Sequence, residues 1–137
     1  TKSVIATSGA LEKIGIEPAN KQISQMLVQD FGIEVEGKNV IIVDDMADTA
    51  NTLCKAADLM VENGAKSVRA IVTHPVMSGK ATENVMNSKM EELIFTDSIP
   101  FDTAKCPKVR ILSIADMFAD TIKRVYNNTS ISSQYLL

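Results

Sequence analysis

Carboxylates and hydroxyls gather in one short stretch, residues 40–52, which reads VIIVDDMADTANT. An apolar run ends in Asp44 and Asp45, Asp48 follows after two more residues, and small and hydroxyl-bearing residues come next. A helical pattern begins directly afterwards, so the N-terminus of a helix should lie beside the acids. The backbone N–H groups and the positive dipole end of a helix N-terminus bind anions. Carboxylates accept hydrogen bonds from sugar hydroxyls or hold Mg²⁺. The pattern therefore indicates a site for a phosphorylated sugar.

The same acids have a simpler interpretation. Asp44 and Asp45 would also fit the end of a strand, with one of them capping the helix that follows, because acids are common at both places. The residues alone leave the two interpretations open.

Apolar β-branched runs alternate with segments of helical spacing along the chain. The runs predict strands, and the segments predict helices that begin at caps such as Asn20 or end at Gly32 and Gly64. The predicted strands are 3–6, 40–43, 68–73, 93–96 and 109–113, and the predicted helices are 20–31, 53–61, 78–86 and 114–125. This alternation predicts an α/β fold, a parallel β-sheet flanked by helices. Residues 9–18 read as irregular, and the polar tail 126–133 should be ordered only by a partner or a ligand.

Polar side chains follow the predicted strands. Asp44, Asp45, His74, Asp97 and Ser113 each fall at or just past a predicted strand end. Parallel strands bring their carboxyl ends to one edge of the sheet, where such folds bind ligands. The sequence therefore predicts a polar edge around the acidic stretch.

Composition limits the classes of partner. The chain has 137 residues, enough for one domain, and a net charge of −3 with a pI near 5.1, which argues against nucleic acid or an anionic membrane as partner. Aromatic residues make up only 4%, too few for a platform that stacks nucleobases. Two isolated cysteines, Cys54 and Cys106, fit a reducing, cytoplasmic compartment. No apolar run approaches the ~20 residues that span a bilayer.

Three further side chains admit both a chemical and a structural role. His74 is the only histidine and suggests a general base, although a role in shaping a loop is favoured over it. Asp97 reads as a loop acid or a metal ligand. Cys54 reads as a small core residue or a nucleophile, and no basic cluster in the sequence would activate it.

The acidic stretch resembles a known motif. Residues 44–52 are similar to the phosphoribosyl-diphosphate (PRPP) loop of type I phosphoribosyltransferases, and more closely to that of the ribose-phosphate diphosphokinase (PRPP synthetase) family. Further segments look like that family in its order, and they extend the resemblance over residues 19–133: 52–58, 64–65, 73–79, 96–100 and 130–132, with Ala19-Asn20 and 36–38 before the loop.

The resemblance implies a phosphoribosyltransferase-type fold and an activity. The family transfers diphosphate from ATP to the C1 hydroxyl of ribose 5-phosphate with Mg²⁺, giving PRPP and AMP, and it assembles through dimers into hexamers. Thr49, Thr52 and backbone N–H groups would hold the 5-phosphate, and Asp44 and Asp45 would face the ribose directly or through Mg²⁺. The implied set of residues that bind ribose 5-phosphate or PRPP is Asp44, Asp45, Asp48, Thr49, Ala50, Asn51 and Thr52. Ser130 and Ser132 match serines at an effector phosphate or nucleotide site between subunits, although they also fit a frayed tail.

The sequence departs from the family pattern at three places. Asn51 stands where the family usually has Gly; Asn tolerates left-handed backbone, but its side chain would crowd the phosphate. Residues 1–18 contain only Lys2 and Lys13 and no Lys-Arg-Arg run. The amino-terminal half that supplies the ATP pocket has no counterpart in these 137 residues. We therefore expect one domain over 1–137, with 1–18 irregular or unmatched, no catalytic residue, and no PRPP synthesis by this chain alone.

Two alternatives stay open. A nucleobase phosphoribosyltransferase would use PRPP, but the Ser-Gly and Ser-Ile-Ser matches and the lack of a base-binding hood argue against it. A non-catalytic regulatory or associated subunit of the same fold would bind PRPP or a synthetase partner. Asn51 and the missing basic loop support this second alternative.

Overall fold

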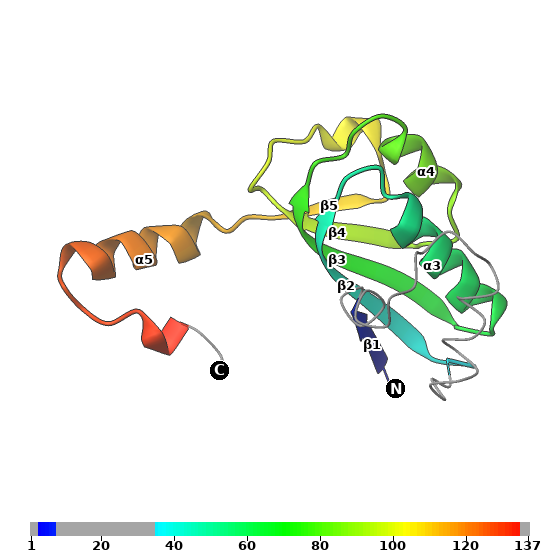
Figure 1. Ribbon diagram of the computed structural model, residues 1–137, viewed down its shortest axis with the longest axis horizontal. Helices are drawn as coiled ribbons and strands as arrows, with labels where there is room; N and C mark the ends of the chain where they lie inside the picture. The colour runs from blue at the N-terminus through cyan, green and yellow to red at the C-terminus, as the bar shows by residue number, and fades with distance from the viewer. Residues whose placement is uncertain (1–2, 8–34, 135–137) are drawn as a thin grey trace, which may run out of the picture.

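The chain forms a parallel sheet of five strands in a computed structural model that describes residues 3–7 and 35–134 (Figure 1). The strands lie in the order of the sequence, β1-β2-β3-β4-β5, and every neighbouring pair is parallel. Their bounds are Ser3–Thr7 (β1), Asn39–Ala47 (β2), Ser67–Pro75 (β3), Glu92–Thr96 (β4) and Val109–Leu112 (β5). The predicted α/β class with a parallel sheet is confirmed. The helix predicted at 20–31, and residues 8–18, lie outside the described residues.

The second strand is longer than its apolar run. β2 continues to Ala47 because β3 supplies a pairing partner for its acidic end, with Asp44 opposite Val72 and Met46 opposite His74. Asp44 and Asp45 thus lie within β2, and His74 lies within β3. The prediction that these three residues fall past strand ends is therefore wrong, because polarity changes before the hydrogen-bond ladder stops.

The other two polar residues of the predicted edge fall where the sequence places them. Asp97 directly follows β4, and Ser113 directly follows β5. The polar edge is therefore built partly from the last residues of β2 and β3 and partly from the residues after β4 and β5.

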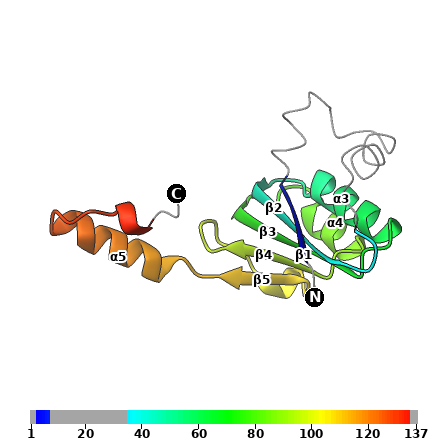
Figure 2. The same cartoon turned by 90° about the horizontal axis from the view of Figure 1, so that it is seen from below.

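One face of the sheet is covered by two helices, α3 (Asn51–Glu62) and α4 (Ala81–Asn87) (Figures 1 and 2). Alternate residues of the central strands point to this face because side chains of a strand alternate. The buried core between sheet and helices contains Val40, Ile42, Leu53, Ala57, Met60, Val68, Ala70, Val72, Ala81, Val85, Leu93 and Phe95. Burial of this apolar surface is the main force that fixes β2, and hence its acidic end, against α3.

The connection from β4 to β5 completes this core. The rings of Phe95 and Phe101 meet edge to face, with centroids 5.3 Å apart, and a short 3₁₀ turn, Thr103–Lys105, leads to the buried Cys106. Cys54 is also buried, and desolvation raises the pKa of its thiol. This supports the role of Cys54 as a small core residue, because a nucleophilic cysteine needs a lowered pKa.

No described helix covers the opposite face of the sheet, whose apolar residues we call the open sheet face: Ile41, Val43, Ile71, Ile94 and Leu112. Ile71 is 40% exposed and Leu112 60% exposed. Strands that follow one another in a single direction carry all their right-handed crossovers on the same side. Topology therefore explains why no helix within residues 35–134 buries this face.

The last helix, α5 (Ala115–Tyr126), extends away from the edge of the sheet (Figures 1 and 2). None of its residues is buried. The tail after it runs back along α5 and ends in a 3₁₀ turn, Ser132–Gln134, where the Gln134 Nε2 donates to Asp120 Oδ2 at 2.7 Å. The tail is therefore held by α5, whereas the sequence predicted order only with a partner or a ligand.

No described helix is long and apolar enough to cross a membrane.

Candidate functional site

The turn between β2 and α3 exposes a helix N-terminus. Residues 48–50, which we call the β2–α3 loop, lead to Asn51, the first residue of α3. Ala50 occupies the N-cap position with a left-handed φ of 56°, and no side chain caps the helix. The first residues of a helix have N–H groups without intrahelical acceptors, so this end of α3 offers backbone donors and the positive dipole end. An anion can bind here without displacing a capping side chain.

The left-handed residue is Ala50, one position before Asn51. The tolerance of Asn for left-handed backbone is not needed at Asn51, because that residue has helical geometry as the first residue of α3. Its side chain is exposed at the mouth of the helix N-terminus. Asn51 thus affects the site through its side chain, while the turn itself depends on Ala50.

Hydrogen bonds from a distant segment hold the β2–α3 loop in place. The Ser78 hydroxyl donates to Asp48 Oδ1, and the Ser78 N–H donates to the Asp48 carbonyl at 2.9 Å. The Met77 N–H donates to the Ala47 carbonyl at 2.9 Å. From α4, Asn84 Nδ2 donates to the carbonyl of Thr49 at 2.9 Å. The connection from β3 to α4 therefore fixes both the loop backbone and the Asp48 carboxylate.

Asp44 and Asp45 lie on opposite faces of β2, because successive side chains of a strand alternate. Asp44 shares the face of Val40 and Ile42, toward α3, and is partly buried, whereas Asp45 is exposed on the other side. The Asp45 N–H donates to Asp44 Oδ1 at 2.9 Å. Asp44 is therefore the acid of this pair on the side of the sheet that α3 covers.

The carboxylates allow only one kind of magnesium site. Among residues 35–134 no group of three or more His, Cys, Asp or Glu side chains could hold a metal ion. Mg²⁺ is commonly held by one or two carboxylates together with the phosphates of a substrate. The hard oxygen ligands of this edge fit an ion shared with a phosphorylated substrate, and they do not form a protein-held cage. The assignment of Mg²⁺ to Asp44 and Asp45 stays a prediction.

His74 is hydrogen-bonded at the neighbouring strand end. Its Nδ1 lies 3.0 Å from the Ser98 hydroxyl, which donates to the Thr73 carbonyl at 3.0 Å. The tautomer of the imidazole sets which of His74 and Ser98 donates in this hydrogen bond. The Thr96 hydroxyl donates to the same carbonyl at 2.7 Å. This network joins the ends of β3 and β4, as the loop-shaping interpretation of His74 requires.

Asp97 fixes the start of α5. Its Oδ1 accepts from the Ile114 N–H at 2.9 Å and its Oδ2 from the Ser113 hydroxyl at 2.5 Å. These two hydrogen bonds, the one from Ile114 foremost, lower the pKa of the Asp97 carboxyl. The geometry is that of a loop acid, the first of the two roles considered for it.

Ser130 and Ser132 lie apart from the β2–α3 loop. They are on the tail that follows α5, which projects away from the sheet (Figure 1). Their hydroxyls are 3.0 Å apart, and Arg124 Nη1 donates to the Ser130 carbonyl at 3.3 Å. The predicted effector residues are thus close to each other and near an arginine, but they do not join the predicted sugar-phosphate residues.

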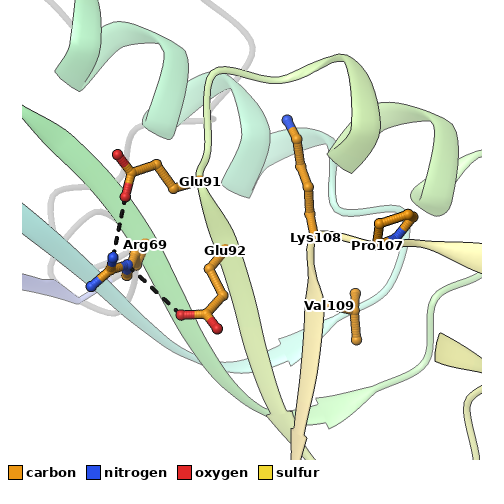
Figure 3. A pocket seen from close by; sticks show the side chains of 6 residues that line it. All are labelled: Arg69, Glu91, Glu92, Pro107, Lys108 and Val109. Atoms are coloured by element: carbon orange, nitrogen blue, oxygen red, sulfur yellow. Dashed lines mark ion pairs between the residues drawn. The ribbon is translucent and has the colours of Figure 1, made fainter.

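A separate pocket lies at the opposite edge of the sheet, at the amino ends of β3, β4 and β5 (Figure 3). Arg69 in its wall pairs with Glu91 at 3.4 Å and with Glu92 at 3.7 Å. The Lys108 ammonium donates to the Ser88 carbonyl at 2.7 Å. Because its cations already have acceptors, this pocket does not compete with the β2–α3 loop as an anion site.

No sequence pattern predicted the hydrogen-bonding roles of Ser78, Asn84 and Ser98. Each contacts a residue more than twenty positions away, and such pairs leave no local pattern. Ser78 does stand inside a segment, 73–79, that carries the family resemblance, which is the one signal that could have identified it.

Comparison with known proteins supports the resemblance. A family model described as the phosphoribosyl synthetase-associated domain matches residues 12–136. The chain belongs to this family. Its segments also match curated ribose-phosphate pyrophosphokinases, another name for the diphosphokinase, and it resembles their carboxy-terminal part.

The relatives of this phosphoribosyl synthetase-associated domain are considerably longer. The enzyme from Porphyromonas gingivalis is 56% identical over 102 residues, which is 74% of this chain and 32% of the relative. Ribose-phosphate pyrophosphokinase 3 from Saccharomyces cerevisiae is 48% identical over 116 residues, covering 83% of this chain and 35% of the relative. The chain thus spans about a third of the length of these relatives.

A solved structure shows the same fold. The crystal structure of phosphoribosylpyrophosphate synthetase from Mycobacterium smegmatis matches with a TM-score of 0.71 and 28% identity, over 92% of this chain and 45% of that one. The phosphoribosyltransferase-type fold expected from the resemblance is therefore confirmed for this phosphoribosyl synthetase-associated domain.

Proposed function

We propose that this chain is the ribose 5-phosphate- and PRPP-binding domain of a ribose-phosphate diphosphokinase. That enzyme transfers diphosphate from ATP to ribose 5-phosphate in nucleotide biosynthesis. The observation that carries the proposal is the N-terminus of α3, which has no capping side chain and lies beside a carboxylate, Asp48, held by Ser78. Membership of the synthetase-associated family supports the same ligand class.

The 5-phosphate would bind at the start of α3. The N–H groups of Asn51 and Thr52 supply donors there, and the hydroxyls of Thr49 and Thr52, both on exposed residues, supply two more. The ordered loop backbone costs little entropy on binding, because Asn84 and Ser78 already restrain it. Ala50 contributes its left-handed backbone, which turns the chain from β2 into α3.

The sugar would face the carboxylates. Ribose hydroxyls are donors, and Asp44, Asp45 and Asp48 are acceptors that lie before and within the loop. A magnesium ion shared between one of these acids and the phosphates would neutralise charge that otherwise repels an anionic substrate. Any metal ligand among Asp44 and Asp45 would therefore act together with the substrate.

The isolated chain should not make PRPP. Diphosphoryl transfer requires several cationic groups around the transferring phosphates. Lys80 is the single lysine or arginine in the segment 76–84 that holds the loop. The ATP site would come from a preceding half of the enzyme or from a neighbouring subunit, so no catalytic residue is assigned here. The same proposal includes a cytoplasmic location, a homo-oligomer, and an effector phosphate site at Ser130 and Ser132.

Calorimetric titration tests the binding proposal. Ribose 5-phosphate and PRPP should bind the full chain, and Mg²⁺ should strengthen PRPP binding. Thr52→Ala and Asp48→Asn should each abolish measurable binding, whereas Asp116→Asn, an acid-to-amide change on remote α5, should bind as the parent chain does. Unchanged affinity in both loop variants would refute the assignment of the loop.

A coupled assay for AMP release from ATP and ribose 5-phosphate tests the catalytic part. We expect no turnover by these 137 residues and measurable turnover after addition of an amino-terminal half from a relative. Robust turnover by the chain alone would contradict the proposal.

The non-catalytic alternative rests on Asn51, whose side chain stands at the helix N-terminus. If an associated subunit is correct, the added amino-terminal half will give no activity even with Asn51→Gly. Binding of ribose 5-phosphate without reconstituted activity would therefore favour that alternative.

A further inference from the structure

The single histidine of the chain stands at the end of the sheet where the β2–α3 loop begins. His74 of β3 is paired with Met46 of β2. Just after His74 along the chain, the Met77 N–H donates to the Ala47 carbonyl at 2.9 Å, directly before the loop. The imidazole is therefore carried by the strand whose continuation holds the β2–α3 loop.

The side chain of His74 lies on the face of the sheet toward α3, at the point where the helices no longer cover it. Side chains of a strand alternate, so His74 shares its face with Val72, and Met46 shares that face with Asp44. Val72 is 1% exposed, whereas Met46 is 49% exposed and His74 is also exposed. The imidazole is thus accessible on the same face as Asp44.

The fold uses one nitrogen of the ring and leaves the other unused. Nδ1 of His74 lies 3.0 Å from the Ser98 hydroxyl, and this contact accounts for the role of the residue in joining two strand ends. The same contact restrains rotation of the ring. Nε2, the ring nitrogen farther from the backbone, has no hydrogen-bond partner within the described part of the chain. Nε2 is therefore free to bind a ligand.

The carboxyl edge of the sheet is rich in acids and poor in cations. Residues 44–52, 74–84 and 96–100 contain one lysine, Lys80, and no arginine. Their acids are Asp44, Asp45, Asp48, Glu83 and Asp97. A phosphate ester is an anion, so these acids repel it, and a positive charge at His74 would offset part of that repulsion. Histidine is the side chain whose charge ordinarily changes between pH 5 and pH 8.

We propose that Nε2 of His74 contacts the phosphate of ribose 5-phosphate, and that the imidazolium form binds this ligand more tightly than the neutral ring. The inference rests on the proposed function, because it adds a residue to the same ligand site. An imidazolium N–H donates to a phosphate oxygen, and a hydrogen bond between ionised partners is stronger than a neutral one. His74 is then a binding residue that makes the affinity for ribose 5-phosphate rise as the pH falls.

Calorimetric titration of the full chain at two pH values tests the role of the charge. The parent should bind ribose 5-phosphate about fivefold more tightly than His74→Asn at pH 6 and about equally at pH 8, because histidine is largely charged only at the lower pH. Asn keeps a polar group near the position of Nδ1, toward Ser98, and has no atom at the position of Nε2. The phosphate of the ligand also titrates near pH 6, and this effect cancels in the ratio of the two affinities.

His74→Lys provides a permanent charge at the same position. Lysine is charged at both pH values, so the ratio of its affinity to that of His74→Asn should be the same at pH 6 and pH 8. If the parent binds no ribose 5-phosphate, the proposed function itself fails. If the parent binds and its ratio to His74→Asn does not change with pH, the role of His74 is overturned and the proposed function stands.

The NMR signal of the imidazole gives an independent measurement. The chain has one histidine and thus one histidine Cε1–H signal, whose position follows the charge of the ring. Ribose 5-phosphate should move the midpoint of this titration to higher pH by ~0.7 unit, because a fivefold preference of the ligand for the charged ring acts reciprocally on proton binding. Ribose, which lacks the phosphate, should leave the midpoint unchanged. A midpoint that stays in place at saturating ribose 5-phosphate would contradict the proposal.

Discussion

At the scale of single residues, the candidate site depends on partners that are distant in sequence. Asp48 and Thr52 are the residues through which we expect ribose 5-phosphate to be recognised, but Ser78 orients Asp48 from the connection between β3 and α4. The Ser78 N–H also donates to the Asp48 carbonyl at 2.9 Å. Removing the hydroxyl should therefore loosen the carboxylate and leave the loop backbone in place.

Ser78→Ala should weaken ribose 5-phosphate binding about fivefold, because one hydrogen bond contributes about 1 kcal/mol. Ser67→Ala is the matched control, since it removes a hydroxyl bonded to Asn39 Oδ1 at 2.8 Å near the opposite end of β3. Both variants should lose similar, small amounts of unfolding free energy, measured by urea denaturation. Equal ribose 5-phosphate affinities in the two variants would show that Ser78 does not support the site.

The sequence predicted an acidic site followed by a helix start, because a change from apolar to acidic residues is a local pattern. It could not assign the left-handed residue to Ala50, because φ is set by the point at which α3 begins. It could not find Asn84 either, since that side chain contacts the Thr49 carbonyl across 35 positions. The residue types of the site follow from the local sequence, whereas the long-range contacts that order them do not.

At the scale of elements, the ends of the strands are harder to predict from the sequence than their centres. The apolar runs located every described strand, but β2 extends past its run because β3 continues to pair with it up to Pro75. Helical spacing likewise located α5. Asp97 is the residue that joins β4 to the start of α5, and its charge makes this connection sensitive to pH.

The Ile114 amide should lose protection in acid. Its acceptor, the Asp97 carboxylate, has a pKa below the ordinary 3.8, so the stabilisation is present above 3.8 and is lost as the pH falls through the lowered value. NMR of the chain should show the Ile114 amide signal constant from pH 7 to pH 4 and changing below that. Val72, in the core of β3, should keep its signal and thus serve as an internal control for global unfolding.

Asp97→Asn provides the matched variant for this titration. An amide still accepts from the Ile114 N–H but does not titrate, so the change below pH 4 should disappear. Persistence of the change in Asp97→Asn would mean that another group controls the start of α5.

The two faces of β4 should differ in their sensitivity to truncation. Leu93 is fully buried beneath the helices, so Leu93→Ala should cost about 2–5 kcal/mol of unfolding free energy. Ile94 is the next residue, on the open sheet face, and Ile94→Ala should cost about 1 kcal/mol or less at concentrations at which the chain is monomeric. Denaturation of the two variants checks this, and equal costs would mean that both faces are covered within one chain.

At the scale of the whole molecule, the chain combines an edge that we propose binds a sugar phosphate with two apolar surfaces that lack covers within its described residues. It corresponds to about a third of the length of its ribose-phosphate pyrophosphokinase relatives. The resemblance in sequence predicted this family and its fold, which the comparisons confirm. Binding of ribose 5-phosphate at the carboxyl edge of the sheet is the central claim.

An amide NMR titration with ribose 5-phosphate tests this claim most directly. The amides of Asn51, Thr52 and Leu53, at the N-terminus of α3, should shift progressively and reach saturation. The amides of Lys66 and Ser67, at the opposite edge of the sheet, should remain unchanged. Unshifted amides at the start of α3, or saturable shifts confined to another part of the chain, would contradict it.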